Sequence, residues 1–293
     1  MTTTHIVVGA GQAGGWAAIS MRRAGFTGRI LLIGDEPWRP YERPPLSKAM
    51  LAADPEPPVL FFHDETLYGE LNIELMLGTP VEEIDPSAHN VRLRGGSLLA
   101  YDRLLLATGG RARALAVPGG RQVHLLRTLE ESRAIRSRLA SARHVVCIGA
   151  GVIGLEIASS ARTRGCAVTV LEAAPSAMGR CVSPEGARFV EGLHRAAGVE
   201  LRFGVTIEAI EAAPHGGARI ICRDATLEAD LVVAGVGMER NLELARDAGL
   251  AIDGGIAVDE LGRTSAAEIF AAGDVAAFLH PQYGRRLRLE SWR

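Results

Sequence analysis

The sequence predicts an α/β fold made from two copies of one pattern: an apolar strand, a glycine-rich turn, a helix, and a second strand ending in an acid. The pattern GxGxxG occurs at residues 9–14 and again at 149–154. Each copy is closed farther along by an apolar run that leads into glycine, at 104–110 and 231–237. Strands alternating with helices build parallel sheets covered by helices. We therefore expect two Rossmann-like, three-layer domains.

Composition limits the possible functions. A chain of 293 residues is long enough for two domains. The net charge of -2 argues against nucleic acid or an anionic membrane as the main partner. We see no apolar run near the roughly 20 residues that span a bilayer and no signal-peptide layout. These observations favour a cytoplasmic protein.

The first copy begins with the apolar strand at 6–8 and turns through three glycines. Gly9 permits a tight turn, Gly11 lets a pyrophosphate approach the backbone, and Gly14 lets the helix pack closely. The free N–H groups at the helix start favour an anion. The next strand, 29–34, ends in Asp35 and Glu36. An acid about 20 residues beyond the glycines can accept hydrogen bonds from ribose hydroxyls, and we favour Asp35 for this role.

The segment that follows is stiff. Three prolines between residues 39 and 48 restrict its backbone, and a helix is expected over 47–53. Lys48 is the single lysine among the 32 basic residues. A lysine kept in an arginine-rich chain suggests a role that a planar guanidinium does not fill. We expect this segment to present Lys48 to a cofactor.

The second copy repeats the first. The strand 144–148 leads to Gly149, Gly151 and Gly154, and the strand 167–171 ends in Glu172. A carboxylate there binds a free ribose 2′-hydroxyl and repels a 2′-phosphate, so the site should prefer NADH to NADPH. Glu156, in the first helical turn, is expected to face the nicotinamide end.

One late strand carries a further acid. The apolar run 269–272 is followed by Gly273 and Asp274. Ligands bind at the carboxyl ends of strands in open α/β sheets. Asp274 is therefore expected to accept a hydrogen bond from a polyol hydroxyl, such as those of a flavin's ribityl chain; a helix N-cap role is compatible with this.

We expect no metal site and no dithiol. The four cysteines form no CxxC pair, and the eight histidines show no ligand-like spacing. The cysteines are expected to act as small buried hydrophobic residues.

With these motifs in place, the sequence resembles the FAD-dependent, NADH-using ferredoxin reductases of bacterial oxygenase systems. These include the reductase components of aromatic-ring dioxygenases (phenylpropionate and biphenyl types) and putidaredoxin reductase-like enzymes. The resemblance covers the whole chain. It rests on GAGQAGG, GDEPWRPYERPPLSK, ATGG, LRTLE, GAGVIGLE, AGVG, AAGD and LESW. The RPPLSK block and the lack of a CxxC pair distinguish this group from related disulfide reductases.

The resemblance implies the cofactors and their contacts. It implies that FAD occupies the first site and NADH the second, with the NADH domain (114–240) inserted into the FAD domain (1–113 and 241–293). The expected FAD-site residues are Gly9, Gly11, Ala13, Gly14, Asp35, Glu36, Arg43, Lys48, Val81, Ala107, Thr108, Gly109, Arg127, Gly273, Asp274 and Trp292. The expected NADH-site residues are Gly149, Gly151, Ile153, Gly154, Glu156, Glu172 and Gly237.

The resemblance also implies a mechanism. NADH passes a hydride to FAD, which releases single electrons to a [2Fe–2S] ferredoxin that supplies an oxygenase. Lys48 is expected to stabilise negative charge on the reduced flavin, with Glu156 holding Lys48 or the nicotinamide amide. Relatives carry a third domain after the LESW motif, and this chain is expected to lack it. The sequence is also compatible with two alternatives: an NADH oxidase or rubredoxin reductase-like flavoenzyme, and a non-catalytic dinucleotide-binding fragment. The oligomeric state is not predicted.

Overall fold

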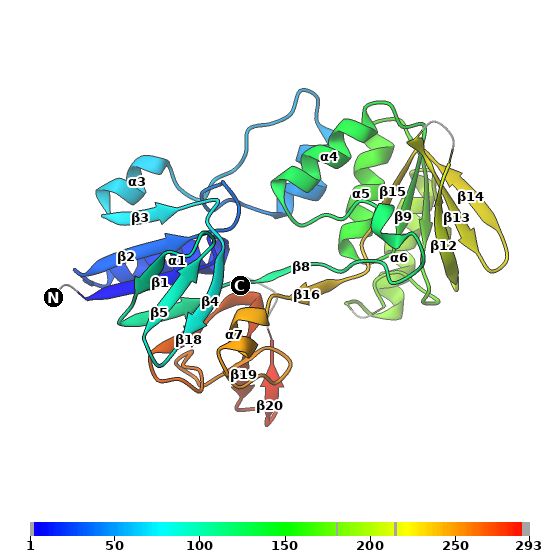
Figure 1. Cartoon of the computed structure of the whole chain (residues 1–293). Helices are drawn as coiled ribbons and strands as arrows, with labels where there is room; N and C mark the ends of the chain where they lie inside the picture. The colour runs from blue at the N-terminus through cyan, green and yellow to red at the C-terminus, as the bar shows by residue number, and fades with distance from the viewer. Residues whose placement is uncertain (1–2, 180, 214–215, 289–293) are drawn as a thin grey trace. The chain divides into compact units, whose positions relative to one another are not determined.

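A computed structural model describes residues 3–179, 181–213 and 216–288. The chain forms two compact units. The first comprises residues 1–42, 59–111 and 240–293, and the second comprises 43–58 and 112–239. Figure 1 follows the chain through them. The strands β8 (Gly110–Ala112) and β16 (Met238–Arg240) pair with each other where the sequence passes from one unit to the other.

A five-stranded parallel sheet forms the centre of the first unit. Its strand order is β18-β7-β1-β2-β3. In the register, Val8 of β1 lies beside Ile33 of β2 and Leu106 of β7, and Leu106 lies beside Ala271 of β18. Ile33 also lies beside Met76 of β3, so all five strands end at the same edge. The strands are β1 (Thr4–Val8), β2 (Arg29–Ile33), β3 (Ile73–Met76), β7 (Arg103–Leu106) and β18 (Ile269–Ala271).

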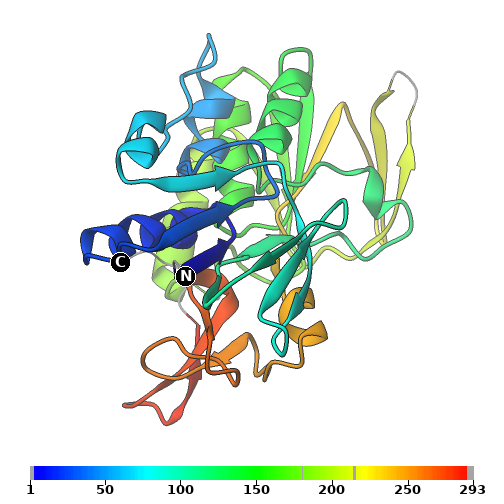
Figure 2. The same cartoon turned by 60° about the vertical axis from the view of Figure 1, so that its left-hand side comes forward.

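The apolar strands alternate their side chains between two cores. Val7 packs with Ile19 of helix α1 (Gln12–Arg23) and with Tyr68 of α3 (Glu65–Glu70). Ile6 and Val8 face the opposite core, with Val91 of an antiparallel sheet. Figure 2 shows α1, in dark blue, along this parallel sheet. The remaining elements are β4 (Val81–Asp85), β5 (Asn90–Leu93), β6 (Leu98–Ala100), α7 (Glu243–Asp247), β17 (Ile256–Val258), β19 (Ala276–His280) and β20 (Arg285–Leu287).

The second unit repeats this plan. Its four parallel strands have the order β11-β10-β9-β15, and Ile148 lies beside Leu171 and Ala234. The antiparallel strands β12, β13 and β14 share a core with one face of this sheet. The strands are β9 (His144–Ile148), β10 (Ala167–Leu171), β11 (Val199–Arg202), β12 (Ile207–Ala212), β13 (Ala218–Cys222), β14 (Thr226–Ala229) and β15 (Leu231–Ala234). The helices are α2 (Ala49–Ala52), α4 (Leu129–Leu139), α5 (Val152–Thr163) and α6 (Pro184–Ala196).

The structure differs from the expected boundaries in one segment. Residues 43–58, which lie within the stretch expected to bind FAD, pack in the second unit. The physical reason is a set of bonds to α4 and α5. Ser132 and Ser160 donate to backbone carbonyls of the segment, and Arg133 lies 2.9 Å from the Glu56 carboxylate. The expected helix over 47–53 is also divided, into a 3₁₀ turn at Pro44–Ser47 and α2.

Across the described ranges, we find no helix with the length and apolar character needed to cross a membrane.

Candidate dinucleotide-binding sites

The glycine loop of the first unit lies between the end of β1 and the start of α1. Gly9 has a φ of +112°, which favours glycine. A Cβ atom there would lie 2.2 Å from the carbonyl oxygen of Ala107, and one at Gly14 would lie 1.9 Å from that of Gly9. These two glycines therefore serve the packing of the protein itself.

Gly11 behaves differently. A Cβ atom built on it would meet no described atom within 4 Å. In the described part of the chain, no side chain caps α1 at this residue. The amino end of a 12-residue helix is thus open beside free space. This arrangement fits an anionic group such as a pyrophosphate, which uses the free N–H groups and the helix dipole.

Several expected residues of the first site meet at this edge. A Cβ atom at Gly273 would lie 2.8 Å from that of Ala13. Thr108 exchanges hydrogen bonds with Asn241, donating to its carbonyl and accepting from its amide, each at 2.9 Å. The Asp274 carbonyl accepts from Arg240 at 3.1 Å.

The two candidate ribose acids follow β2. Asp35 is exposed, whereas Glu36 is half-buried and accepts a 2.6 Å hydrogen bond from the Tyr41 hydroxyl. Thr79 donates to the Gly34 carbonyl at 2.8 Å, which ties the chain just before Val81 to this edge. Val81 itself packs on an apolar core.

The second unit has the same loop geometry. Gly149 has a φ of +98°, and a Cβ atom at Gly154 would lie 2.0 Å from the Gly149 carbonyl oxygen. The nearest described atom to a Cβ atom at Gly151 would be the Gly235 carbonyl oxygen at 3.9 Å. Ile153 stands 40% exposed at the open end of α5, an apolar surface beside the anion position. Gly237, with a φ of +112°, follows β15 at this edge.

Glu172 follows β10 and faces the glycine loop. Its carboxylate accepts from the backbone N–H of Ala150 at 2.7 Å and of Ala174 at 2.8 Å. These bonds fix the carboxylate at the position where a Rossmann site recognises a ribose.

Lys48 and Glu156 form one polar group with Ser47. The Lys48 ammonium lies 2.7 Å from the Glu156 carboxylate, and the Ser47 hydroxyl donates to the same carboxylate. The ammonium also donates to the Pro44 carbonyl at 3.1 Å. Lys48 remains half exposed, so its charge is available to a ligand.

The second unit also holds two other residues that were expected at the FAD site. Arg43 donates to the Arg127 carbonyl at 2.6 Å. The Arg127 N–H donates to Glu131, which forms a capping box with Thr128 at the start of α4. Contacts therefore group Arg43, Lys48 and Arg127 with the second glycine loop. Trp292 lies outside the described residues.

Comparison with known proteins establishes the family. Residues 3–293 match the model for pyridine nucleotide-disulphide oxidoreductases. The chain belongs to this family. It is 43% identical to rhodocoxin reductase of Rhodococcus erythropolis over 289 residues. The aligned region covers 98% of this chain and 68% of that protein. It is 40% identical to the ferredoxin–NAD(+) reductase component of an anthranilate 1,2-dioxygenase system from Burkholderia cepacia, over 98% of this chain and 71% of that one.

A solved structure of the family has the same fold. The ferredoxin reductase for the CYP199A2 system from Rhodopseudomonas palustris superposes with a TM-score of 0.93 at 41% identity, over 98% of this chain and 72% of that one. The predicted fold class is thus confirmed, as is the predicted resemblance. Ferredoxin–NAD(+) reductases of this pyridine nucleotide-disulphide oxidoreductase family use FAD and NADH, in agreement with the expected cofactors.

The cysteines of this family member are not arranged as a redox pair. Cys147, Cys166 and Cys222 are buried as expected, whereas the prediction was wrong for Cys181, which is exposed; all four are free. Burial raises the pKa of Cys147 to about 12. Within the described ranges, no group of three or more potential ligands could hold a metal ion.

Sequence reasoning missed the residues that hold Lys48 in place. These are Ser47, Ser132 and Ser160; it also missed Glu131, which accepts from the Arg127 N–H. The Thr128–Glu131 spacing is a capping-box signature and was visible in the sequence. Ser160 stands four residues after Glu156, on the same side of a helix. That spacing alone did not indicate a partner, because the partner lies 113 residues away in the chain.

Proposed function

We propose that this chain is a flavoprotein reductase that transfers electrons from NADH through FAD to a [2Fe–2S] ferredoxin, which in turn supplies an oxygenase. The observation that carries the proposal is the pair of open glycine loops. Each lies at the carboxyl edge of its own parallel sheet, with space at the second glycine. One relative of this chain is the reductase component of a dioxygenase system, and another is the ferredoxin reductase for a CYP system.

In this proposal the first unit binds FAD and the second binds NADH. The N–H groups at the start of α1 and α5 hold the two pyrophosphates. Asp35, Glu36 and Asp274 accept hydrogen bonds from hydroxyls of FAD. Glu172 accepts hydrogen bonds from the adenosine ribose and disfavours NADPH, because a carboxylate repels a 2′-phosphate.

When bound, the flavin supplies the redox chemistry by accepting a hydride from NADH and releasing electrons singly. The side chains supply position and charge. We expect Lys48 to supply a positive charge for the negative charge on the reduced flavin; within its own unit, Glu156 holds that ammonium at 2.7 Å. Arg43 and Arg127 add positive charge from the same unit. A cytoplasmic location is part of this proposal, since the reaction depends on a supply of NADH.

The decisive experiment is a visible spectrum of the purified chain, incubated with FAD and then mixed with NADH without oxygen. Bound flavin that bleaches on NADH addition supports the proposal. Reduced protein is then mixed with a [2Fe–2S] ferredoxin, a rubredoxin or oxygen. Turnover that needs the ferredoxin favours the reductase, whereas equal rates with oxygen favour an NADH oxidase. A chain that binds NADH but no flavin would be a dinucleotide-binding module instead.

A further inference from the structure

Two buried serine hydroxyls hold the backbone around Lys48. Ser132 of α4 is fully buried and donates to the Leu46 carbonyl at 2.7 Å. Ser160 of α5 is 5% exposed and donates to the Ser47 carbonyl at 2.7 Å. Its hydroxyl also lies 3.4 Å from the carbonyl of Lys48. The Leu46 and Ser47 carbonyls thus receive side-chain donors from two helices that are distant in sequence, whereas the Lys48 carbonyl already accepts from the N–H groups of Leu51 and Ala52.

These bonds are needed because the helix is broken at Lys48. The 3₁₀ turn ends at Ser47 and α2 begins at Ala49, while Lys48 has a φ of -114° and a ψ of -106°, outside the helical region. In an unbroken helix, the N–H group four residues later would satisfy each carbonyl. A buried carbonyl without a donor is costly. At the break, Ser132 and Ser160 supply the donors for the Leu46 and Ser47 carbonyls.

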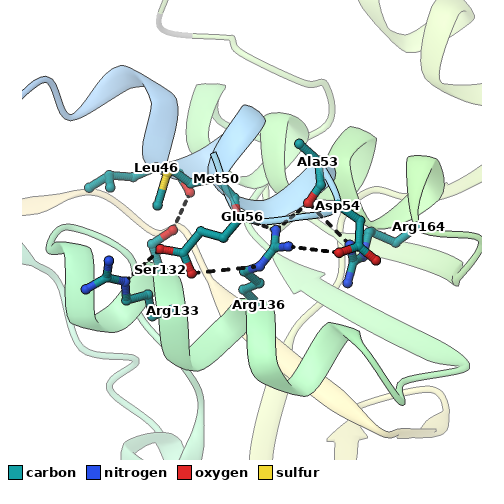
Figure 3. A network of polar contacts seen from close by, with 9 residues as sticks. All are labelled: Leu46, Met50, Ala53, Asp54, Glu56, Ser132, Arg133, Arg136 and Arg164. Carbon is teal, nitrogen blue, oxygen red and sulfur yellow. Dashed lines mark hydrogen bonds and ion pairs between the residues drawn. The ribbon is translucent and has the colours of Figure 1, made fainter. Parts of the chain in front are cut away.

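Helices α4 and α5 each contact this segment at more than one point. Glu156 and Ser160 lie one turn apart on α5, so one helix face binds the Lys48 ammonium and the neighbouring backbone. On α4, Arg136 lies one turn after Ser132. Arg136 donates to the Met50 carbonyl at 3.0 Å and also to that of Ala53 (Figure 3).

We propose that Ser160 and Ser132 are positioning residues for Lys48. By satisfying the carbonyls at the break, they fix the Lys48 backbone and so the direction of its side chain. Without them, the segment relaxes toward a regular helix, which turns the ammonium away from Glu156. This inference rests on the proposed function, since it gives Lys48 its role at the flavin.

The single lysine of the chain makes the test direct. The full chain is labelled with ¹³C,¹⁵N-lysine, so every side-chain lysine signal comes from Lys48. The variants are Ser160→Ala and Ser132→Ala. Their matched controls are Ser159→Ala on α5 and Ser137→Ala on α4, which change exposed serines of the same helices. Glu156→Gln shows how the signal changes when the ion pair is lost.

We expect Ser160→Ala and Ser132→Ala to shift the Lys48 signal toward that of Glu156→Gln. Amide exchange at Leu51 and Ala52, whose N–H groups donate to the Lys48 carbonyl, should become about tenfold faster. Flavin reduction by NADH should slow about tenfold at saturating NADH, with little change in NADH affinity. The controls should match the wild type, and Ser160→Thr, which keeps the hydroxyl, should restore the signal.

A Lys48 signal and amide exchange unchanged in both alanine variants would overturn the inference. A slower reduction with an unchanged signal would also count against it, because the serines would then act by another route. If the wild-type chain is not reduced by NADH, the proposed function fails. The Lys48 signal of the variants still decides the positioning role in that case. Folding is checked separately by the melting temperature of each variant.

Discussion

Single residues in this protein divide into those that the sequence identifies by type and those that only the fold identifies. Glu172 was predicted as a ribose-binding acid from its place at the end of a strand. In the structure its carboxylate accepts a hydrogen bond from the Ala150 N–H of the glycine loop. Ser160 was not predicted, because its partner carbonyl lies in a segment that local patterns do not connect to α5. A hydroxyl that donates to a carbonyl far away in the chain produces no periodic pattern in the sequence.

We predict that Glu172→Gln weakens the preference for NADH over NADPH. The amide keeps an acceptor for the ribose but loses the charge that repels a 2′-phosphate. The ratio of kcat/KM for the two nucleotides should fall about tenfold, corresponding to about 1.4 kcal/mol. Asp224→Asn, an exposed acid in a turn, serves as the control. An unchanged ratio would show that Glu172 does not face the ribose.

At Lys48, the proposed function predicts that arginine is a poor replacement. Lys48→Arg keeps the charge but changes a compact ammonium into a planar fork. Lys48→Met removes the charge. Flavin reduction by NADH should slow about a hundredfold in Lys48→Met and less in Lys48→Arg, because a donor aimed at developing charge is lost or misplaced. Stopped-flow absorbance measures both rates, and full activity of Lys48→Met would exclude the charge role.

At the scale of elements, most of the fold could be predicted from local pattern. The strands β2, β9, β10 and β18 lie where apolar runs predicted them. The division of the expected helix at Lys48 could not be predicted, because residues 47–53 have ordinary helix formers. The break depends on tertiary donors. The assignment of 43–58 to the second unit has the same cause, since its contacts come from α4 and α5.

The three glycines of one loop should respond differently to alanine. At Gly11 the φ is -84° and a Cβ atom would meet no described atom within 4 Å, so Gly11→Ala should fold normally and lose FAD affinity. At Gly14 a Cβ atom would lie 1.9 Å from a backbone oxygen. Gly14→Ala should therefore lower the free energy of unfolding by about 1–3 kcal/mol. Denaturant melts and FAD titration measure the two effects; equal stability losses would contradict the assignment.

The start of β9 should make stability depend on pH. The Asp230 carboxylate accepts from the N–H groups of Arg143 and His144 at 2.8 and 3.0 Å. The His144 N–H, followed by that of Arg143, lowers the pKa of Asp230 below its ordinary 3.8. Since the folded pKa lies below the unfolded one, this stabilisation is present above the unfolded pKa and is lost as the pH falls through the folded one. Asp230→Asn should flatten the loss of stability between about pH 5 and pH 2. Melting temperatures measured across this range test the prediction, with Asp224→Asn again as the control.

At the scale of the whole chain, the repeat predicts two sites that can be disabled separately. A ligand that binds only the folded state raises stability by about 2.7 kcal/mol at a concentration 100 times its Kd. FAD should therefore raise the melting temperature of Gly151→Ala but not that of Gly11→Ala. NADH should raise the melting temperature of Gly11→Ala but not that of Gly151→Ala. If either variant loses both responses, the assignment of one dinucleotide to each unit is wrong.

The strand order of the two sheets also determines when each sheet can be completed during synthesis on the ribosome. The parallel sheet of the second unit needs no residue beyond Ala234, the end of β15. In the first unit, β18 lies beside β7, so its sheet gains its last strand only when residues 269–271 emerge. Chains emerge amino end first. The nascent first unit must therefore keep its β7 edge unpaired while the complete second unit is made.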